Sequence, residues 1–315
     1  MTIYISVRPF VPGKSGGIVG YLENLVTALA SRPGLELHTG HSYSNFGEIG
    51  RDWPANVQRH ALQGLDTAII AEMERNLIDH LSPDWILYFY PFYFNYYPSN
   101  GKTRVATCVP DIQHVHLGTN FTPIERRDRD LQFTEAIEQS DFIYTLSDFC
   151  RDDIARHYPR AAGRIFTVYP AAPHAWDKPA SGGESLVVRE KYHLPDRFIL
   201  YNANPWPHKN HDNLLAALQL MSARNQGVPC VFTGADTQGV LQGKIATLGL
   251  EATVKSLGYV DEEDLKRLMA SAEMLVFPSR FEGFGIPVLE AFGAGLPVVC
   301  SNICSMPEVG GDAAE

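Results

Sequence analysis

The chain has 315 residues, which is long enough for two domains with separate hydrophobic cores. Its composition, 45% hydrophobic and 20% charged, is that of a globular protein, and a formal net charge of −10 argues against a general surface for nucleic acid or anionic membrane. No apolar run approaches the roughly 20 residues that cross a bilayer, so we expect no membrane-spanning helix.

The first half of the chain alternates between predicted strands and helices. Residues 2–7 read as a strand and not as a signal peptide, because no basic region or cleavage site follows them. After a glycine-rich loop over 11–17, a helix is indicated by apolar residues at helical spacing, namely Ile18, Tyr21, Leu22, Leu25 and Leu29. Further strands are predicted near 35–40, 85–90, 103–107, 142–146 and 165–169, with helices near 67–81, 124–139 and 148–158. Such alternation indicates a parallel sheet with helices on both faces.

The second half repeats this alternation after a stretch rich in Pro, Ala and Gly. Strands are predicted at 198–201, 229–233, 253–257, 274–277 and 296–299, and helices at 211–223, 238–248, 261–272 and from Pro287 onward. We therefore expect an acceptor-side domain over 1–172, a linker over 173–195 and a second Rossmann-like domain over 196–315. Another strand and helix would be expected after Glu315, so the second domain is predicted to be incomplete.

Cysteine usage indicates the compartment. The five cysteines are odd in number and show no metal-ligand pairing, and they lie at Cys108, Cys150, Cys230, Cys300 and Cys304. They are best interpreted as small buried thiols in a reducing compartment, which predicts a cytoplasmic protein.

The segment from Glu282 to Glu290, EGFGIPVLE, carries the strongest functional signal. It follows a predicted buried strand, and Pro287 suits the first turn of a helix. Gly283 and Gly285 would let the backbone approach a ligand, while N–H groups near Gly285 and Ile286 would meet an anion at the positive end of the helix. An acid beside such a helix end can accept hydrogen bonds from sugar hydroxyls. An ordinary turn with two solvated acids is the alternative, but the combination favours a nucleotide-sugar site.

A second candidate segment is the loop 202–210, NANPWPHKN, which lies between a predicted strand and a predicted helix. Lys209 could place its charge on a diphosphate there. A solvated surface lysine is the alternative, although a cation is slightly disfavoured near a helix N-terminus. Asn204 and His208 flank Lys209 and are weaker candidates for the same site.

Three further features of the first half could contribute to a site. Gly16 and Gly17 would bring the first helix close to a phosphate or sugar, or would only form a tight packing turn. Asp111 and His114 follow a strand end, where an acid and histidines suit a catalytic role. The aromatic stretch 85–97 suits an acceptor with apolar sugar faces or a lipid, although a packed loop over the sheet edge explains it as well.

These segments together resemble a known family, the GT-B glycosyltransferases of family 4, also called group 1 glycosyltransferases. The phosphate-binding loop is matched by YNANPWPHKNH at 201–211, and the two-glutamate motif by 282–290. AGLPVV at 294–299 and MPEVGGD at 306–312 match the segments that follow, and 16–25, 111–114 and 145–147 match amino-terminal ones. The resemblance implies two doubly wound Rossmann-like domains facing a cleft.

The resemblance also implies an activity, which is the transfer of a hexose from a nucleotide diphosphate sugar with retention of configuration. Glu290 would hold the donor ribose and Glu282 the sugar hydroxyls, and the N–H groups from Phe284 to Ile286 would meet the sugar and diphosphate. Lys209 would neutralise the departing diphosphate. No metal or other cofactor is implied. One partner would be the nucleotide-sugar donor, with GDP-mannose favoured over UDP-glucose. The other would be a carbohydrate or lipid-linked acceptor, which the protein could reach by a peripheral contact with a membrane. No nucleic-acid partner is expected.

Three departures from the family keep other interpretations open. Ala203 and Asn204 stand where many relatives carry an arginine, and Pro110 replaces a common histidine, which leaves His114 as its substitute. Relatives also continue past residue 315, so we expect a fragment or truncated product with weakened activity. The alternatives are a nucleotide-sugar-binding protein without transfer activity, or another enzyme on this fold, such as a sugar-nucleotide epimerase or a phosphorylase.

Overall fold

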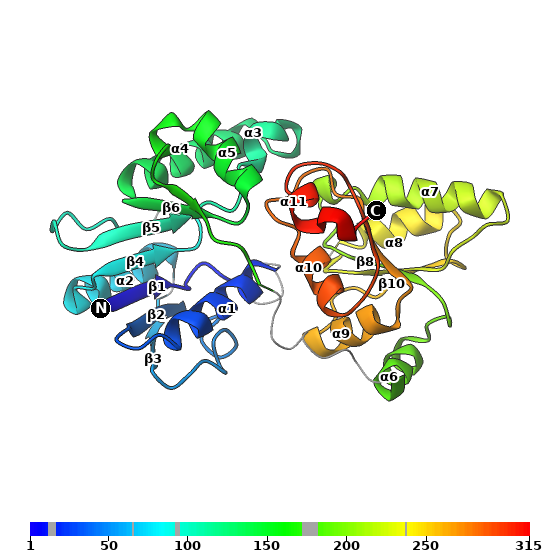
Figure 1. Ribbon diagram of the computed structural model, residues 1–315, viewed down its shortest axis with the longest axis horizontal. Helices are drawn as coiled ribbons and strands as arrows, with labels where there is room; N and C mark the ends of the chain where they lie inside the picture. Colours follow the sequence, from blue (N-terminus) through cyan, green and yellow to red (C-terminus); the bar gives the residue numbers. More distant parts are fainter. Residues whose placement is uncertain (12–16, 65, 92–94, 172–181, 237) are drawn as a thin grey trace. The chain divides into compact units, whose positions relative to one another are not determined.

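The computed structural model describes residues 1–11, 17–64, 66–91, 95–171, 182–236 and 238–315. The chain divides into two compact units, Met1–Ala171 and Ala172–Glu315, which are described separately below. Each unit is built on one parallel sheet with helices packed against it (Figure 1). The predicted α/β class with two doubly wound sheets is therefore confirmed.

The first unit holds a seven-stranded sheet in the order β3-β2-β1-β4-β5-β6-β7. The strands are β1 (Thr2–Ser6), β2 (Glu36–Ser42), β3 (Val57–Leu62), β4 (Trp85–Tyr88), β5 (Arg104–Cys108), β6 (Phe142–Thr145) and β7 (Ile165–Thr167). All pairings are parallel, and the order reverses between β1 and β4, so this is the point where ligands bind in doubly wound sheets. The edge strand β3 was not predicted, because its sequence VQRHAL has no clear apolar alternation.

The helices of the first unit differ in whether a side chain caps their start. They are α1 (Ile18–Ala30), α2 (Thr67–Leu81), α3 (Gln113–His116), α4 (Pro123–Gln139) and α5 (Asp148–His157), with short 3-10 turns at Gly118–Asn120 and Pro159–Ala161. Asp66 and Ser147 cap α2 and α5, and Thr122 forms a capping box with Glu125 at the start of α4. Figure 1 shows α4 and α5 beside β5 and β6.

The second unit holds a five-stranded sheet in the order β10-β9-β8-β11-β12. The strands are β8 (Ile199–Asn202), β9 (Cys230–Thr233), β10 (Val254–Ser256), β11 (Met274–Phe277) and β12 (Val298–Cys300). The helices are α6 (Gly182–Tyr192), α7 (His211–Ala223), α8 (Val240–Thr247), α9 (Glu262–Ser271), α10 (Ile286–Gly293) and α11 (Met306–Gly310), with 3-10 turns at Pro207–Lys209 and Gly311–Ala313. Here the strand order reverses between β8 and β11, which places the switch point of this sheet beside both candidate segments.

The segment 173–195 was expected to be a linker, but it contains helix α6. Val188 on this helix is fully buried in the core of the second unit, and Arg189 donates a hydrogen bond to the carbonyl oxygen of Ser271 at 3.0 Å. The Tyr192 hydroxyl donates to a carboxylate oxygen of Asp264 on α9 at 2.6 Å. The sequence did not reveal this helix because neighbouring Pro, Ala and Gly residues obscure its short apolar pattern.

Two expectations about composition are also tested by the structure. All five cysteines are free thiols, and Cys108, Cys150 and Cys230 are buried, as predicted, while Cys300 and Cys304 are half-buried. Among the described residues, no helix has both the length and the apolar character needed to cross a bilayer.

Candidate functional site

Two loops of the second unit leave neighbouring strands at the switch point of the sheet. The loop 203–210 follows β8 and the loop 278–285 follows β11, and β8 and β11 pair in parallel. The loops are joined by backbone and side-chain hydrogen bonds. Arg280 N donates to the carbonyl oxygen of His208 at 2.7 Å, and Asn210 Nδ2 donates to the carbonyl oxygen of Pro278 at 2.9 Å. The sheet topology and these bonds therefore bring the two candidate segments together.

Lys209 and Glu282 form an ion pair where these loops meet. Lys209 Nζ lies 2.6 Å from Glu282 Oε1, and their side chains are only 13% and 10% exposed. The Tyr201 hydroxyl donates to the carbonyl oxygen of Lys209, and the Lys209 ammonium lies 5.4 Å from the centre of the Phe277 ring. A charge pair that is shielded from water interacts strongly with any group that enters beside it. The structure thus places a cation and a carboxylate, 73 residues apart in sequence, at one point.

Gly285 sets the shape of the turn before α10. Its φ of +100° is favourable only for glycine, and an added Cβ would lie 2.2 Å from Met306 Cε. Ser305 Oγ supports the same turn, because it lies 2.9 Å from the carbonyl oxygen of Glu282 and 3.0 Å from that of Phe284. Gly285 is the N-cap of α10 and offers no side-chain cap, so the positive end of this helix faces the turn. The predicted helix start is present, with Gly283 buried and Ile286 half-buried, while the approach of a ligand to this turn stays a prediction.

Glu290 lies on α10 about one turn beyond Gly285 and is half-buried. Removal from water raises the pKa of its carboxyl group to about 7, and the nearby charge of Glu262 raises that pKa further. Near neutral pH this side chain can therefore be present with and without its proton. A carboxyl group in this state can either donate to or accept from a ligand hydroxyl.

His208 and Asn204 occupy different places in the loop after β8. His208 is buried, and burial together with the adjacent Lys209 lowers the pKa of its imidazole to about 4, so the ring is neutral at pH 7. Asn204 Oδ1 accepts a hydrogen bond from Ala235 N at 2.7 Å, which ties the loop to the segment after β9. Asn204 therefore has a structural contact in addition to its predicted role.

In the first unit, Asp111 and His114 lie beyond the carboxyl end of β5. Asp111 is half-buried, and its Oδ1 accepts from Gln113 N at 3.0 Å. His114 is only 1% exposed: its Nε2 lies 3.2 Å from Asp130 Oδ1, and its ring centre lies 4.6 Å from that of Phe133. Burial lowers the pKa of its imidazole. The ring thus packs in the core of this unit, and a catalytic role for His114 stays a prediction.

The amino-terminal glycine loop is only partly described. Gly16 and residues 12–15 lie outside the described residues. Gly17 is exposed and is the N-cap of α1 with φ −62° and ψ −13°, a conformation that any residue adopts. Its backbone therefore gives no reason for glycine at this position.

The aromatic stretch 85–97 contributes mainly to packing where it is described, since residues 92–94 lie outside the described part. Phe89 is 2% exposed, and its ring centre lies 5.8 to 6.0 Å from those of Phe10, Tyr21 and Tyr144. The Tyr88 hydroxyl donates to the carbonyl oxygen of Tyr96 at 2.8 Å. For these residues the packed-loop interpretation is the better one.

Two clusters of polar side chains were not predicted from the sequence. Glu74 of α2 is fully buried and accepts hydrogen bonds from Tyr4 at 3.0 Å, Ser6 at 2.6 Å and Arg8 at 2.8 Å. It reads in the sequence as one polar residue of an amphipathic helix. The second cluster joins His116 of α3 to Asp153 and His157 of α5. The spacing of Asp153 and His157 over one helical turn was its only sequence signal.

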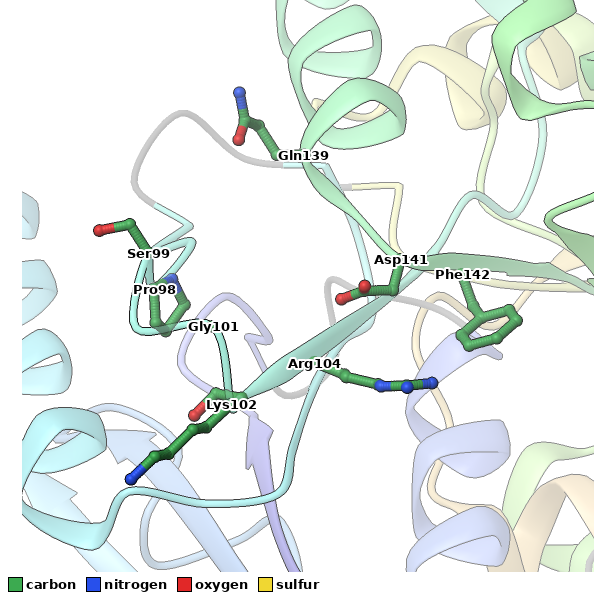
Figure 2. A pocket seen from close by; sticks show the side chains of 9 residues that line it. Pro98, Ser99, Gly101, Lys102, Arg104, Gln139, Asp141 and Phe142 are labelled. Carbon is green, nitrogen blue, oxygen red and sulfur yellow. The ribbon is translucent and has the colours of Figure 1, made fainter.

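One surface hollow lies apart from the predicted site residues. It has a volume of about 600 Å³ and lies at the amino-terminal ends of β5 and β6. Figure 2 shows the side chains that line it, among them Lys102, Arg104, Gln139, Asp141 and Phe142. Ligand sites in doubly wound sheets lie at the carboxyl ends of strands. None of the predicted site residues within the described part of the chain lines this hollow.

Comparisons with known proteins relate part of the chain to a described family. Residues 188–314 match the family described as "Glycosyl transferases group 1". The chain is 36% identical over 224 residues to the O-antigen chain mannosyltransferase B of Escherichia coli, covering 70% of this chain and 58% of that protein. It is 32% identical over 156 residues to the MMP alpha-(1->4)-mannosyltransferase of Mycolicibacterium hassiacum, covering 49% of this chain and 38% of that protein. The chain thus spans about three-fifths and two-fifths of the lengths of these two relatives.

Solved structures show the same fold. The Anabaena Alr3699/HepE crystal structure in complex with UDP and glucose superposes with a TM-score of 0.75 at 18% identity, covering 98% of this chain and 82% of that one. WaaG, a glycosyltransferase involved in lipopolysaccharide biosynthesis, superposes with a TM-score of 0.71 at 17% identity, covering 98% of this chain and 83% of that one. The fold class is therefore the GT-B class predicted from the sequence.

Proposed function

We propose that this chain, whose residues 188–314 belong to the glycosyl transferases group 1 family, transfers a hexose from a nucleotide diphosphate sugar to a carbohydrate or lipid-linked acceptor. The observation that carries the proposal is the shielded pair of Lys209 and Glu282, which lies at the switch point of the second sheet beside the glycine turn of α10. A cation, a hydroxyl acceptor and a positive helix end at one place suit the diphosphate and the sugar of such a donor.

Lys209 is proposed to bind the diphosphate without losing Glu282. An ammonium group has three donor hydrogens, so it can bond the carboxylate and a phosphate oxygen at once. When the glycosidic bond breaks, negative charge grows on the diphosphate, and a fixed ammonium near it lowers the barrier. Glu282 would then accept hydrogen bonds from sugar hydroxyls on the other side of the pair.

The helix α10 supplies the remaining donor contacts in this proposal. N–H groups at Phe284 to Ile286 would meet the sugar and diphosphate at the positive end of the helix. Glu290 would hold the ribose, for which a carboxyl group with a pKa of about 7 offers both an acceptor and a donor form. Positive charge at the diphosphate would thus come from Lys209 and the helix, so the proposed transfer needs no divalent metal.

The proposed transfer retains the anomeric configuration. The bond between the anomeric carbon and the diphosphate oxygen breaks, and the acceptor hydroxyl oxygen bonds to the same face of that carbon. Its proton passes to a phosphate oxygen of the donor, which leaves as the nucleoside diphosphate. No side chain then has to act as a nucleophile, and Asp111 in the first unit is proposed to orient the acceptor or the sugar.

The sugar is proposed to be mannose carried by GDP. The support is the two relatives named above, because both are described as mannosyltransferases. UDP-glucose is the competing donor, since the Alr3699/HepE structure holds UDP and glucose. We expect the acceptor to be a glycan or a lipid-linked glycan, reached by a cytoplasmic protein at a membrane surface.

A transfer assay tests this proposal. The chain is incubated with GDP-mannose or UDP-glucose and a simple mannoside acceptor, with and without EDTA, and release of nucleoside diphosphate and the anomer of the product are measured. We expect turnover with one donor, a product of unchanged configuration, no effect of EDTA and loss of turnover in Lys209→Met. If Lys209→Met turned over the donor as fast as the wild-type chain, that result would contradict the assigned site.

The second candidate function is donor binding without transfer. It is favoured by the loop after β8, where buried Ala203 and the bonded amide of Asn204 offer no guanidinium to the diphosphate. Donor binding that depends on Lys209, without turnover or donor hydrolysis, would support this function over the first.

A further inference from the structure

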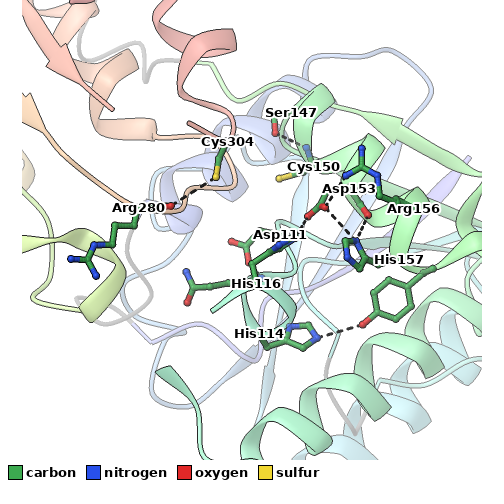
Figure 3. Close-up of polar contacts among 12 residues, drawn as sticks. Asp111, His114, His116, Ser147, Cys150, Asp153, Arg156, His157, Arg280 and Cys304 are labelled. Atoms are coloured by element: carbon green, nitrogen blue, oxygen red, sulfur yellow. Dashed lines mark hydrogen bonds and ion pairs between the residues drawn. The ribbon is translucent and has the colours of Figure 1, made fainter. Parts of the chain in front are cut away.

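The cluster of His116, Asp153 and His157 in the first unit has the chemistry of a metal site. Figure 3 shows His116, Asp153 and His157 next to one another. Ligand atoms from the three residues all lie within 4.8 Å of one another. His116 Nε2 lies 2.7 Å from Asp153 Oδ2, and His157 Nδ1 lies 3.3 Å from Asp153 Oδ1. Two imidazoles therefore converge on the two oxygens of one carboxylate.

Burial distinguishes this cluster from an ordinary group of surface charges. The Asp153 side chain is only 4% exposed, while those of His116 and His157 are 33% and 31% exposed. A buried carboxylate needs compensation by positive charge or hydrogen bonds. An ion could still reach it, because both imidazoles border on solvent. The carboxylate is thus fixed in the interior, and the histidines can adjust around it.

The backbone favours the same ligand set. Asp153 and His157 are four residues apart on α5, so their side chains lie on one face of that helix. His116 comes from the last position of α3, and its ring centre lies 5.1 Å from that of His157. Arg156 Nη1 is 3.7 Å from Asp153 Oδ1, but its side chain is 72% exposed and is free to turn toward solvent. A cation could replace it without moving either helix.

We propose that these three residues bind a zinc ion, which clamps α3 onto α5. Two histidines and one carboxylate form a common ligand set for zinc, with a fourth position open to water or another ligand. Zinc–ligand distances near 2.0–2.2 Å require the three side chains to close in on one point. His157 Nδ1, which lies 2.9 Å from the carbonyl oxygen of Asp153, would exchange that contact for the metal, or the ring would bind through Nε2. The site lies in the first unit and shares no residue with the proposed donor contacts of the second unit.

The clamp would act on the segment that carries Asp111. Asp111 and His116 belong to one short stretch, and α3 has only four residues, so it has little stability of its own. A bond from His116 through zinc to α5 would hold this stretch against the rest of the unit. We therefore expect zinc to raise the melting temperature of the chain, while the proposed transfer still proceeds in EDTA.

Zinc titration of the whole chain tests the proposal directly. The metal-free chain is titrated with Zn²⁺ by calorimetry, and its melting temperature is followed in parallel, for wild type, His116→Ala and His157→Ala. His80→Ala is the matched control because His80 is an exposed histidine at the end of α2. We expect one zinc per chain in wild type and in His80→Ala. Loss of a residue that only supports a metal ligand weakens metal binding about 10- to 100-fold. His116→Ala and His157→Ala each remove a direct ligand, so each should weaken zinc binding by more than that.

Cobalt provides a second readout that separates this site from the thiols. Co²⁺ bound through nitrogen and oxygen gives visible ligand-field bands, whereas a thiolate ligand adds a near-ultraviolet charge-transfer band. We expect visible bands without the charge-transfer band in wild type, unchanged in Cys304→Ser. Equal zinc affinity in wild type and both histidine variants would overturn the proposal, as would a thiolate band that disappears in Cys304→Ser. If one histidine variant fails to fold, as judged by circular dichroism without metal, the other variant and the wild-type cobalt spectrum decide.

Discussion

Breaking the Lys209–Glu282 pair should destabilise the second unit far more than breaking an exposed ion pair. In Lys209→Met the carboxylate of Glu282 loses its cation in a site where the side chain is only 10% exposed. Removing one partner of a buried ion pair costs about 3–5 kcal/mol, because the remaining charge has lost its compensation. The matched control is Lys244→Met, since Lys244 lies 2.5 Å from Asp212 with side chains 45% and 65% exposed. That exposed pair should contribute about 0–1 kcal/mol.

A double-mutant cycle measured by urea unfolding shows how much of the loss of stability in Lys209→Met comes from the interaction between Lys209 and Glu282. The variants are Lys209→Met, Glu282→Gln and the double variant, with the corresponding cycle for Lys244 and Asp212. In the double variant neither charge is left unpaired, so its cost should be smaller than the sum of the single costs, with a coupling of about 1–3 kcal/mol. The reasoning is refuted if Lys209→Met costs no more than Lys244→Met, or if the coupling energy is zero.

Three further predictions concern residues that the sequence assigned to the site. Gly285→Ala should destabilise the protein by about 2 kcal/mol or more, because φ at Gly285 is +100° and the new methyl group would meet Met306. Gly295→Ala is the control, because Gly295 has φ +70° but open space around it, and it should cost only about 1 kcal/mol. Thermal unfolding measures both variants. The pKa of Glu290 is raised to about 7 in the folded chain, so the unfolded chain binds fewer protons than the folded chain between pH 4.5 and 7. The free energy of unfolding should therefore fall by up to about 3 kcal/mol as pH rises through this window, and it should level off above pH 7. Glu290→Gln should abolish this fall, and an unchanged pH profile would contradict the account. His114→Ala should cost about 2 kcal/mol or more of stability by removing a buried ring, while donor binding, measured by calorimetry, should be unaffected.

The sequence predicted the sheets well because buried parallel strands leave a strong local signal. Runs such as FILY at 198–201 and MLVF at 274–277 are short and apolar, and turn residues bound them. Strand β3 lacks such a run, since it lies at the sheet edge and needs little apolar surface. Helix α6 was missed for a related reason, because Val188 is the one buried residue among its described side chains, at 186–192.

The candidate site could be predicted where one short segment carries both the functional side chains and the residues that fix their backbone. The EGFGIPVLE motif fixes its own turn and helix start, so Glu282, Gly285 and Glu290 could be placed from the sequence. Contacts between distant segments were not predictable. The ion pair of Lys209 with Glu282 and the burial of Glu74 depend on which strands and helices become neighbours, and no local pattern encodes that.

The central claim is that the loops after β8 and β11 bind a nucleotide diphosphate sugar. The most direct test is a calorimetric titration of the chain with GDP-mannose, UDP-glucose, GDP and UDP, repeated with Lys209→Met and Glu290→Ala and in the presence of EDTA. The account predicts that one nucleotide is preferred, that both substitutions weaken its binding at least about tenfold, equivalent to about 1.4 kcal/mol, and that EDTA has no effect. Binding of equal strength in both variants, or no binding of any of these nucleotides, would contradict it.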